Sequence, residues 1–252
     1  MKIARFSSGG DPRFGIVDGD EIVVLTGDPM FSGFDTTEER VPIAGLRLLA
    51  PVIPRSKVIC IEGNYPQNPD EDADAPPELH LKPNTTVVGP GDAIRLPGDA
   101  GTLVHEGELV VVIGRIATQV PADDALDYVF GYTVGNDVTA SELMAEPGQQ
   151  SRAKGYDTFA PVGPIIETEL DPQNVTITTR VDGETRISGS TSGMKHTVAE
   201  LVSFASGIFT LLPGDIIMTG SPAGDGAIRP GQFVEVGIEG IGTLGNPTRQ
   251  RA

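Results

Sequence analysis

Short apolar stretches separated by glycine and proline recur along the whole chain, and they limit what it can fold into. The 32 glycines and 21 prolines make 53 of the 252 residues, while apolar residues still account for 38%. That is enough for a sizeable core, so the excess of glycine and proline does not indicate disorder or collagen. Short strands joined by tight turns fit the pattern, and we predict a mostly β, α+β fold.

Local signals predict two hairpins, one helix and several strands. Asp18-Gly19 and Asp182-Gly183 each lie between apolar runs, as in tight β-hairpins. Thr197 and Glu200 have the spacing of a helix capping box, and apolar residues continue at helical spacing up to Phe209. The apolar runs 58–61, 109–113, 216–218 and 233–238 are predicted strands.

The first part of the chain is predicted to be a separate small unit. Apolar runs at 3–6, 14–17 and 21–25 predict strands, and a polar, acidic stretch follows up to Arg40. Pro51 and Pro54 then mark a boundary. We therefore expect a small N-terminal β domain at residues 1–52 and a main domain at residues 53–252.

Charge and cysteine content exclude several classes of partner and site. Lys and Arg number 18 against 35 Asp and Glu, a formal charge of −17, so nucleic acid and anionic membrane surfaces would repel the chain. The sequence has neither an apolar run of about 18 residues nor an apolar signal peptide, so we expect a soluble, cytoplasmic protein. Cys60 is the only cysteine, which excludes an internal disulfide, and its apolar surroundings predict a buried side chain.

Three carboxylates are candidate metal ligands. Glu106 and Glu108 share one face of a predicted strand, because side chains at i and i+2 point the same way. Two like charges side by side repel each other unless a cation or solvent lies between them. Asp137 follows another apolar run and could supply a third oxygen for Mg²⁺, Mn²⁺ or Ca²⁺. The alternative is a solvated Glu-x-Glu pair, which is common on strand faces.

Two further segments could bind a substrate near such a metal. The ammonium of Lys154 could bind a substrate carboxylate or stabilise an enolate or oxyanion, although a loop lysine is more often solvated. The segment 220–226 begins with Gly220 and Ser221 and could hold an anionic oxygen with backbone N–H groups. The alternative for this segment is a simple tight turn.

Taken in order, a series of motifs resembles the fumarylacetoacetate hydrolase family. The motifs are Lys57–Tyr65, Lys82-Pro83 with Gly89–Asp92, His105–Leu109 with Val112–Gly114, Gly131–Ala140, Lys154 with Asp157–Pro161, Pro213–Ile217 with Thr219–Gly224, and Ile238–Leu244. The likeness runs from Lys57 to about Pro247, which is 191 of the 252 residues. It implies a mixed β-sandwich roll that is usually a homodimer.

The resemblance also implies a site and a chemistry. The two glutamates and the aspartate that hold the family's divalent metal fall on Glu106, Glu108 and Asp137, and the active-site lysine falls on Lys154. Members cleave or rearrange small 2-oxo and 1,3-dicarbonyl acids. The metal, expected here to be Mg²⁺ or else Mn²⁺ or Ca²⁺, chelates the oxo-acid oxygens and stabilises the developing enolate.

The sequence departs from the family at three positions. Asn68 stands where hydrolytic members carry a water-activating histidine, whereas Glu71 keeps the position of the paired glutamate. An amide does not exchange a proton near neutral pH, and loss of a general base typically costs about 10²–10⁴ in rate. Ser141 and Met144 replace an arginine and a glutamine that hold the substrate. The residues expected to contact substrate are Tyr65, Ser141, Met144, Gly220 and Ser221.

The sequence therefore predicts a divalent-metal-dependent enzyme for a small 2-oxo or 1,3-dicarbonyl acid, with Lys154, Glu71 and Asn68 as catalytic positions. Asn68 favours decarboxylation or tautomerisation, while hydrolysis stays open if Glu71 or a metal-bound hydroxide serves as base. A second hypothesis is a degenerate relative that only binds such a ligand. In a third, the acidic loop from Asp70 to Glu78 supplies a different acid or base.

Overall fold

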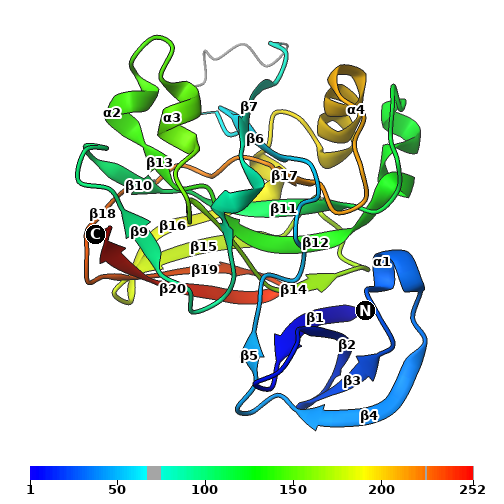
Figure 1. The fold of residues 1–252 in the computed structure, drawn as a ribbon. Helices are drawn as coiled ribbons and strands as arrows, with labels where there is room; N and C mark the ends of the chain where they lie inside the picture. The colour runs from blue at the N-terminus through cyan, green and yellow to red at the C-terminus, as the bar shows by residue number, and fades with distance from the viewer. Residues whose placement is uncertain (67–74, 225, 252) are drawn as a thin grey trace.

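The computed structural model describes residues 1–66, 75–224 and 226–251, and its strands confirm the mostly β fold (Figure 1). The largest sheet has twelve strands. Along its main path lie β4 (Thr36–Pro42), β3 (Glu21–Leu25), β2 (Arg13–Asp18), β1 (Lys2–Ser7), β14 (Ala160–Glu167), β12 (Val129–Asn136), β11 (Gly107–Ile113), β17 (Ile216–Met218), β6 (Val58–Glu62) and β7 (Glu78–Lys82). In addition, β5 (Arg47–Leu48) pairs with β1, and β8 (Val87–Val88) pairs with β14.

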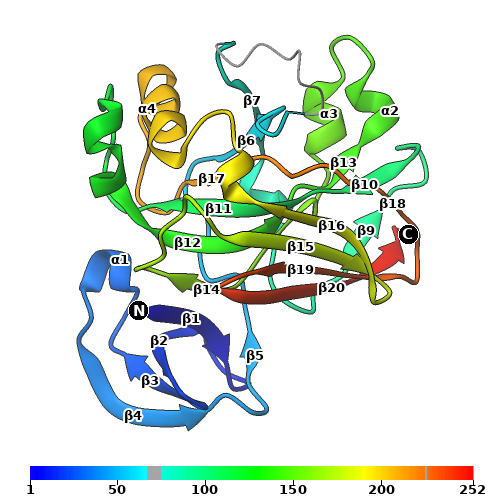
Figure 2. The same ribbon diagram turned by 180° about the vertical axis from the view of Figure 1, so that it is seen from behind.

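A second sheet packs against the centre of the first. Its five strands, in spatial order, are β16 (Glu184–Ser190), β15 (Thr176–Val181), β19 (Phe233–Ile238), β20 (Gly242–Gln250) and β9 (Ile94–Leu96). Figures 1 and 2 show β15 and β19 alongside β11 and β12 from both sides. Leu109 and Val134 from the first sheet meet Ile177 and Val236 from the second in one buried apolar cluster, which gives the molecule its sandwich core.

A small third sheet and the helices complete the fold. The sheet contains β13 (Thr139–Ala140), β10 (Leu103–His105) and β18 (Gly226–Ile228). The α-helices are α1 (Pro29–Ser32), α2 (Ser141–Met144), α3 (Gln150–Lys154) and α4 (Val198–Ile208), and the 3₁₀ turns are η1 (Asn84–Thr86), η2 (Ala122–Tyr128) and η3 (Thr191–Gly193). No helix formed by the described residues is long and apolar enough to cross a lipid bilayer.

The predicted hairpins and helix are confirmed. Both Asp-Gly pairs form tight turns, between β2 and β3 and between β15 and β16, and Asp182 and Gly183 have φ values of 52° and 82°. Thr197 and Glu200 form the expected capping box at the start of α4, because each side chain accepts the other residue's backbone N–H. Cys60 is buried in β6, as predicted.

The acidic stretch before Arg40 holds a strand that sequence reasoning did not predict. β4 pairs with β3 at the edge of the large sheet, and its residues Thr36–Arg40 are exposed. An edge strand exposed in this way does not need apolar side chains, and charged ones discourage pairing with other chains. β1 continues the same sheet into β14, with Lys2 opposite Glu167. The division of the chain at residue 52 stays a prediction.

Candidate active site

The pairing of four neighbouring strands brings carboxylates that are distant in the sequence to the same end of these strands in the large sheet. β17 runs parallel to β6 and antiparallel to β11, so the end of β6 and the start of β11 lie on the same side. Glu62 is the last residue of β6 and Glu108 is the second residue of β11. Glu106 immediately precedes β11, in the break after β10, and so lies outside the predicted strand. Asp137 follows β12, and its N–H donates to the carbonyl of Glu106 at 2.8 Å. Residues up to 75 positions apart thus become neighbours.

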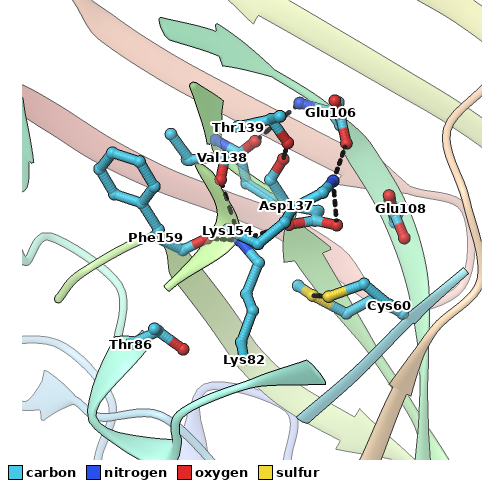
Figure 3. Close-up of polar contacts among 12 residues, drawn as sticks. Cys60, Lys82, Thr86, Glu106, Glu108, Asp137, Val138, Thr139, Lys154 and Phe159 are labelled. Carbon is cyan, nitrogen blue, oxygen red and sulfur yellow. Dashed lines mark hydrogen bonds and ion pairs between the residues drawn. The ribbon is translucent and has the colours of Figure 1, made fainter. Parts of the chain in front are cut away.

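Lys154 lies at the centre of this cluster (Figure 3). It is the last residue of α3, and only 1% of its side chain is exposed. Its Nζ lies 2.7 Å from Oε1 of Glu62, 3.0 Å from Oε2 of Glu106 and 2.8 Å from Oδ2 of Asp137. The ammonium is therefore held by three carboxylates inside the protein, rather than solvated in a loop.

A second buried lysine, to which the sequence analysis assigned no role, holds the other oxygen of Asp137. Lys82 ends β7, and its ammonium forms an ion pair with Oδ1 of Asp137. It also donates to the carbonyl oxygens of Val138, at 2.9 Å, and Phe159, at 2.6 Å. Lys82 thus connects the turn that carries Asp137 to the chain that follows α3.

Glu108 differs from the other carboxylates because no salt bridge within the described part of the chain includes it. The side chain is buried, and Oε2 accepts the N–H of Gly220 at 2.8 Å. Burial raises the pKa of Glu108 well above its usual range, and the nearby charges of Asp137 and Glu106 raise it further. A cation beside these three carboxylates would offset that cost.

Burial also shifts the pKa values of the neighbouring acids. It raises the pKa of Glu106 to about 7, against the opposing effect of Lys154. It would do the same for Asp137, but Lys154 and Lys82 more than offset burial and lower the pKa of Asp137 to about 2. Asp137 is therefore favoured in its charged form near neutral pH.

The residues present fit a hard divalent cation. Four carboxylates and two ammonium groups leave two negative charges in excess when all are ionised, which one divalent cation would balance. Oxygen atoms of Glu62, Glu106 and Asp137 lie within 4.8 Å of one another. Oxygens on opposite sides of Mg²⁺ or Ca²⁺ are separated by roughly 4 to 5 Å, and in this structure the ammonium of Lys154 lies within 3.0 Å of all three residues. The structure thus brings Glu106 and Asp137 together and adds Glu62, whereas Glu108 is not part of this group. The ligand set Glu106, Glu108 and Asp137 stays a prediction.

The turn after β17, which contains Gly220, binds a side chain of the protein itself. The N–H of Gly220 does donate to a carboxyl oxygen, but this oxygen belongs to Glu108. Gly220 has a φ of 94°, and a Cβ there would lie 3.0 Å from Cβ of Asn64, so a side chain would disturb the turn. Ser221 follows it with its hydroxyl 3.3 Å from the carbonyl of Pro222. Tyr65, which is 6% exposed, packs beside the same turn.

The other predicted substrate contacts lie on α2. Ser141 begins this helix, and its hydroxyl donates to the carbonyl of Thr102 at 3.2 Å. Met144 packs against a buried apolar cluster that includes Leu143 and Phe159. A role in substrate binding stays a prediction for both residues. Asn68 and Glu71 lie outside the described residues.

A pocket of about 170 Å³ reaches the carboxylate cluster at Glu62. Its lining residues are Glu62, Gly63, Ala75, Pro76, Pro77, Glu78, Lys195 and His196. The side chain of Glu62 is 27% exposed, against 1% for Lys154 and Asp137. Glu106 is 18% exposed, so solvent reaches both Glu62 and Glu106, and Glu62 is the one that lines this pocket.

Asn64 fixes the wall of this pocket. Its side-chain N–H₂ donates to the carbonyls of Thr219 and His196, and its Oδ1 accepts the N–H of His196. The carbonyl of Asn64 accepts the N–H of Lys195. One buried amide thereby joins the strand end that carries Glu62 to the turn before Gly220 and to the segment before α4.

Comparisons with known proteins give the same family as the motifs. The family described as fumarylacetoacetate (FAA) hydrolase C-terminal matches residues 57–249. A second, described as Rv2993c-like, N-terminal, matches residues 1–51. The resemblance predicted from the sequence motifs is therefore confirmed.

Similar proteins cover most or all of the chain. Protein Rv2993c of Mycobacterium tuberculosis is 44% identical over 98% of this chain and 97% of its own length. The oxaloacetate tautomerase YisK of Bacillus subtilis is 38% identical over 81% of this chain and 73% of its own length.

Solved structures extend the likeness to the complete fold. The 5-carboxymethyl-2-hydroxymuconate delta-isomerase of Mycobacterium smegmatis superposes with a TM-score of 0.93 at 42% identity, over all of both chains. The maleylpyruvate hydrolase of Sphingobium sp. SYK-6, solved with manganese(II) and pyruvate, gives 0.83 at 29% identity, also over all of both chains. The relatives named for a reaction here are thus a tautomerase, an isomerase and a hydrolase.

Proposed function

This chain belongs to the fumarylacetoacetate hydrolase family and is an enzyme of that family, and we propose that it rearranges a small 2-oxo or 1,3-dicarbonyl acid. The observation that carries the proposal is the position of Lys154, whose buried ammonium contacts Glu106, Asp137 and Glu62, the last of which lines a pocket. A fixed positive charge of this kind stabilises an oxygen that becomes negative during a reaction.

The proposed metal ligands are Glu106, Glu108 and Asp137. Glu106 and Asp137 lie with Glu62 around the ammonium of Lys154, and their charges also act on Glu108. Glu108 has a greater need for a cation than Glu62, because burial opposes the charge of Glu108 and no ammonium pairs with it among the described residues. A bound Mg²⁺ or Mn²⁺ would act as a Lewis acid that polarises the substrate's carbonyl oxygens.

Lys154 provides the second positive charge. When a proton leaves the carbon next to a carbonyl, negative charge moves to the carbonyl oxygen, and an ammonium nearby lowers the energy of that enolate. Asp137 and Glu106 orient the ammonium, since both accept hydrogen bonds from it. Neighbouring carboxylates also keep Lys154 protonated: burial lowers its pKa, but Asp137, Glu106 and Glu62 raise the pKa well above its usual value.

Proton transfer is the reaction that best suits this chain. Asn68 replaces the histidine that activates water in hydrolytic members, and an amide cannot perform that step. Tautomerisation needs no activated water, and the tautomerase and isomerase named above are among the relatives. We therefore place tautomerisation or isomerisation first, with decarboxylation as a related use of the same enolate.

Hydrolysis is the second candidate, and the similarity to maleylpyruvate hydrolase supports it. In that case Glu71 or hydroxide would take the role of the base. A protein that binds the ligand without converting it is the third. We also propose that the enzyme is a cytoplasmic homodimer without nucleic-acid or membrane partners, on the grounds of charge and family resemblance.

A substrate panel with and without chelator tests the proposal. Enol and keto forms of oxaloacetate differ in ultraviolet absorbance, so their interconversion can be followed directly, beside hydrolysis of acylpyruvates. We expect turnover that EDTA abolishes and Mn²⁺ or Mg²⁺ restores, and that Glu106→Gln lowers by at least about 100-fold. Glu184→Gln, at an exposed hairpin position, is the matched control and should keep full activity. Turnover that is insensitive to both EDTA and Glu106→Gln would refute the proposal.

A further inference from the structure

Lys82 holds Asp137 from a fully buried position. Its Nζ donates to the carbonyls of Val138 and Phe159 and forms an ion pair with Oδ1 of Asp137. Moving the ammonium away from Asp137 would break all three contacts inside the protein, which is costly. Lys82 is therefore a rigid support under Asp137.

The two carboxylate oxygens of Asp137 contact different ammonium groups. Oδ1 faces Lys82, whereas Oδ2 faces Lys154 at 2.8 Å (Figure 3). Rotation of the carboxylate would break the contacts to both ammonium groups inside a buried site, which is costly. Asp137 can thus offer Oδ2 to a cation, while Oδ1 stays with Lys82.

Glu108 is restricted in a similar way. Its Oε2 accepts the N–H of Gly220 at 2.8 Å, and the backbone at Gly220 is fixed by its turn. A carboxylate held through one oxygen cannot turn freely to present both oxygens to the same cation. Two of the three proposed ligands are therefore held in orientations that favour a single donor atom each.

We propose that Lys82 is a positioning residue that keeps Asp137 a one-oxygen ligand, and that the site thereby discriminates against Ca²⁺. The inference rests on the metal site of the proposed function. Ca²⁺ takes about six to eight oxygens and often binds carboxylates through both, whereas Mg²⁺ and Mn²⁺ accept about six donors with few from protein. One-oxygen carboxylates also leave positions at which a chelating oxo-acid can bind.

The test compares the dissociation constants of Mn²⁺ and Ca²⁺ by titration calorimetry, without substrate. Wild type should bind Mn²⁺ at least about tenfold more tightly than Ca²⁺. Lys82→Met frees Oδ1 of Asp137, so the ratio of the two constants should fall by at least about fivefold, while Lys82→Arg should retain more of it. The ratio is informative because partial loss of folded protein affects both metals alike.

Lys57→Met is the matched control. It also removes a lysine–aspartate ion pair, with Nζ 2.6 Å from Oδ2 of Asp215, but leaves Lys82 and Asp137 unchanged, so the ratio should stay at the wild-type value. Should Lys82→Met fail to fold by circular dichroism, Lys82→Gln serves in its place. The amide of Lys82→Gln can donate to a carbonyl but has no charge for Asp137, and the ratio should also fall.

Two results would overturn the inference. One is wild-type protein that binds Ca²⁺ as tightly as Mn²⁺, and the other is an unchanged ratio in a folded Lys82 variant. Both outcomes leave the proposed function standing, because the protein still binds a divalent metal. Failure of wild type to bind either metal would instead remove the metal site, and with it the basis for this inference.

Discussion

Lys154 and Asp137 form an ion pair with Nζ 2.8 Å from Oδ2, and each side chain is only 1% exposed. The two residues come from a helix end and a strand end that are 17 positions apart. Removing both charges from water is costly, and a protein rarely retains such a pair for stability alone. The pair instead holds a charged ammonium at a fixed place beside further carboxylates, as the proposed enolate chemistry would use.

Loss of the Lys154 ammonium should reduce catalysis more than metal binding. Lys154→Met removes the group that stabilises the developing oxyanion, and we expect kcat to fall by about 10²–10³. Mn²⁺ affinity should stay equal or rise, because a competing positive charge has gone. Steady-state kinetics and calorimetry on the same preparation measure the two effects. A Lys154→Met protein with wild-type kcat would show that the ammonium takes no part in the reaction.

Glu108 and Glu62 should differ in their effect on metal affinity. Glu108→Gln removes a proposed ligand, so we expect Mn²⁺ affinity to fall by about 100-fold or more. Glu62 is 27% exposed and pairs with Lys154, so Glu62→Gln should weaken Mn²⁺ binding by less than about tenfold. Calorimetry of both variants beside Glu184→Gln decides the question. The opposite order would make Glu62, in place of Glu108, the third ligand.

Acid should remove the stabilising effect of a second buried ion pair, at Asp215. Burial raises the pKa of this carboxyl, but hydrogen bonds from Lys57, from the N–H of Leu212 and from Ser56 more than offset it, and the pKa lies below its usual value. The stabilisation is therefore present above the ordinary pKa near ~3.9 and is lost as pH falls through the lower folded value.

Asp215→Asn tests this dependence. At pH ~7 we expect it to lower the free energy of unfolding by about 2–4 kcal/mol, because it leaves Lys57 without its partner. Urea denaturation of both proteins from pH ~7 to ~3 should show a constant difference down to about pH 5, which then shrinks. A difference that grows toward pH ~3 would contradict the assigned sign.

The capping box of α4 makes a modest contribution to stability. Thr197→Ala removes the hydroxyl that accepts the N–H of Glu200, so we expect a loss of about 1 kcal/mol in the free energy of unfolding. Thr185→Ala, at an exposed strand position, is the control and should cost less than about half as much. Chemical denaturation measures both. Equal losses in the two variants would mean that the cap contributes nothing specific.

Features with a local cause could be predicted from the sequence. The Asp-Gly hairpins and the α4 cap depend on residues within a few positions of one another, and the structure contains them. The β4 strand was missed, because an exposed edge strand needs no apolar alternation. The burial of Lys154 depends on strands that pair across long stretches of chain, and local patterns carry no record of that pairing.

The residues of the candidate site also divide into those with a local sequence signal and those that depend on long-range strand pairing. Glu106, Glu108 and Asp137 were candidates because two were expected on one strand face and the third follows an apolar run, and the structure groups Glu106 with Asp137. Glu62 and Lys82 were missed as site residues, although both lie in motifs shared with the family. In the sequence, Glu62 is a single acid at the end of an apolar run, and Lys82 is a lysine at the end of a short strand. Neither pattern indicates a site by itself, because the two residues reach the carboxylates only when β6 and β7 pair beside β17.

The most direct test of the central claim is a crystal structure of the wild-type enzyme with Mn²⁺, with anomalous scattering used to locate the metal. We predict one strong anomalous peak within about 2.5 Å of oxygens from Glu106, Glu108 and Asp137, with the ammonium of Lys154 beside it. A crystal equilibrated with saturating Mn²⁺ that shows no peak among these carboxylates would contradict the account.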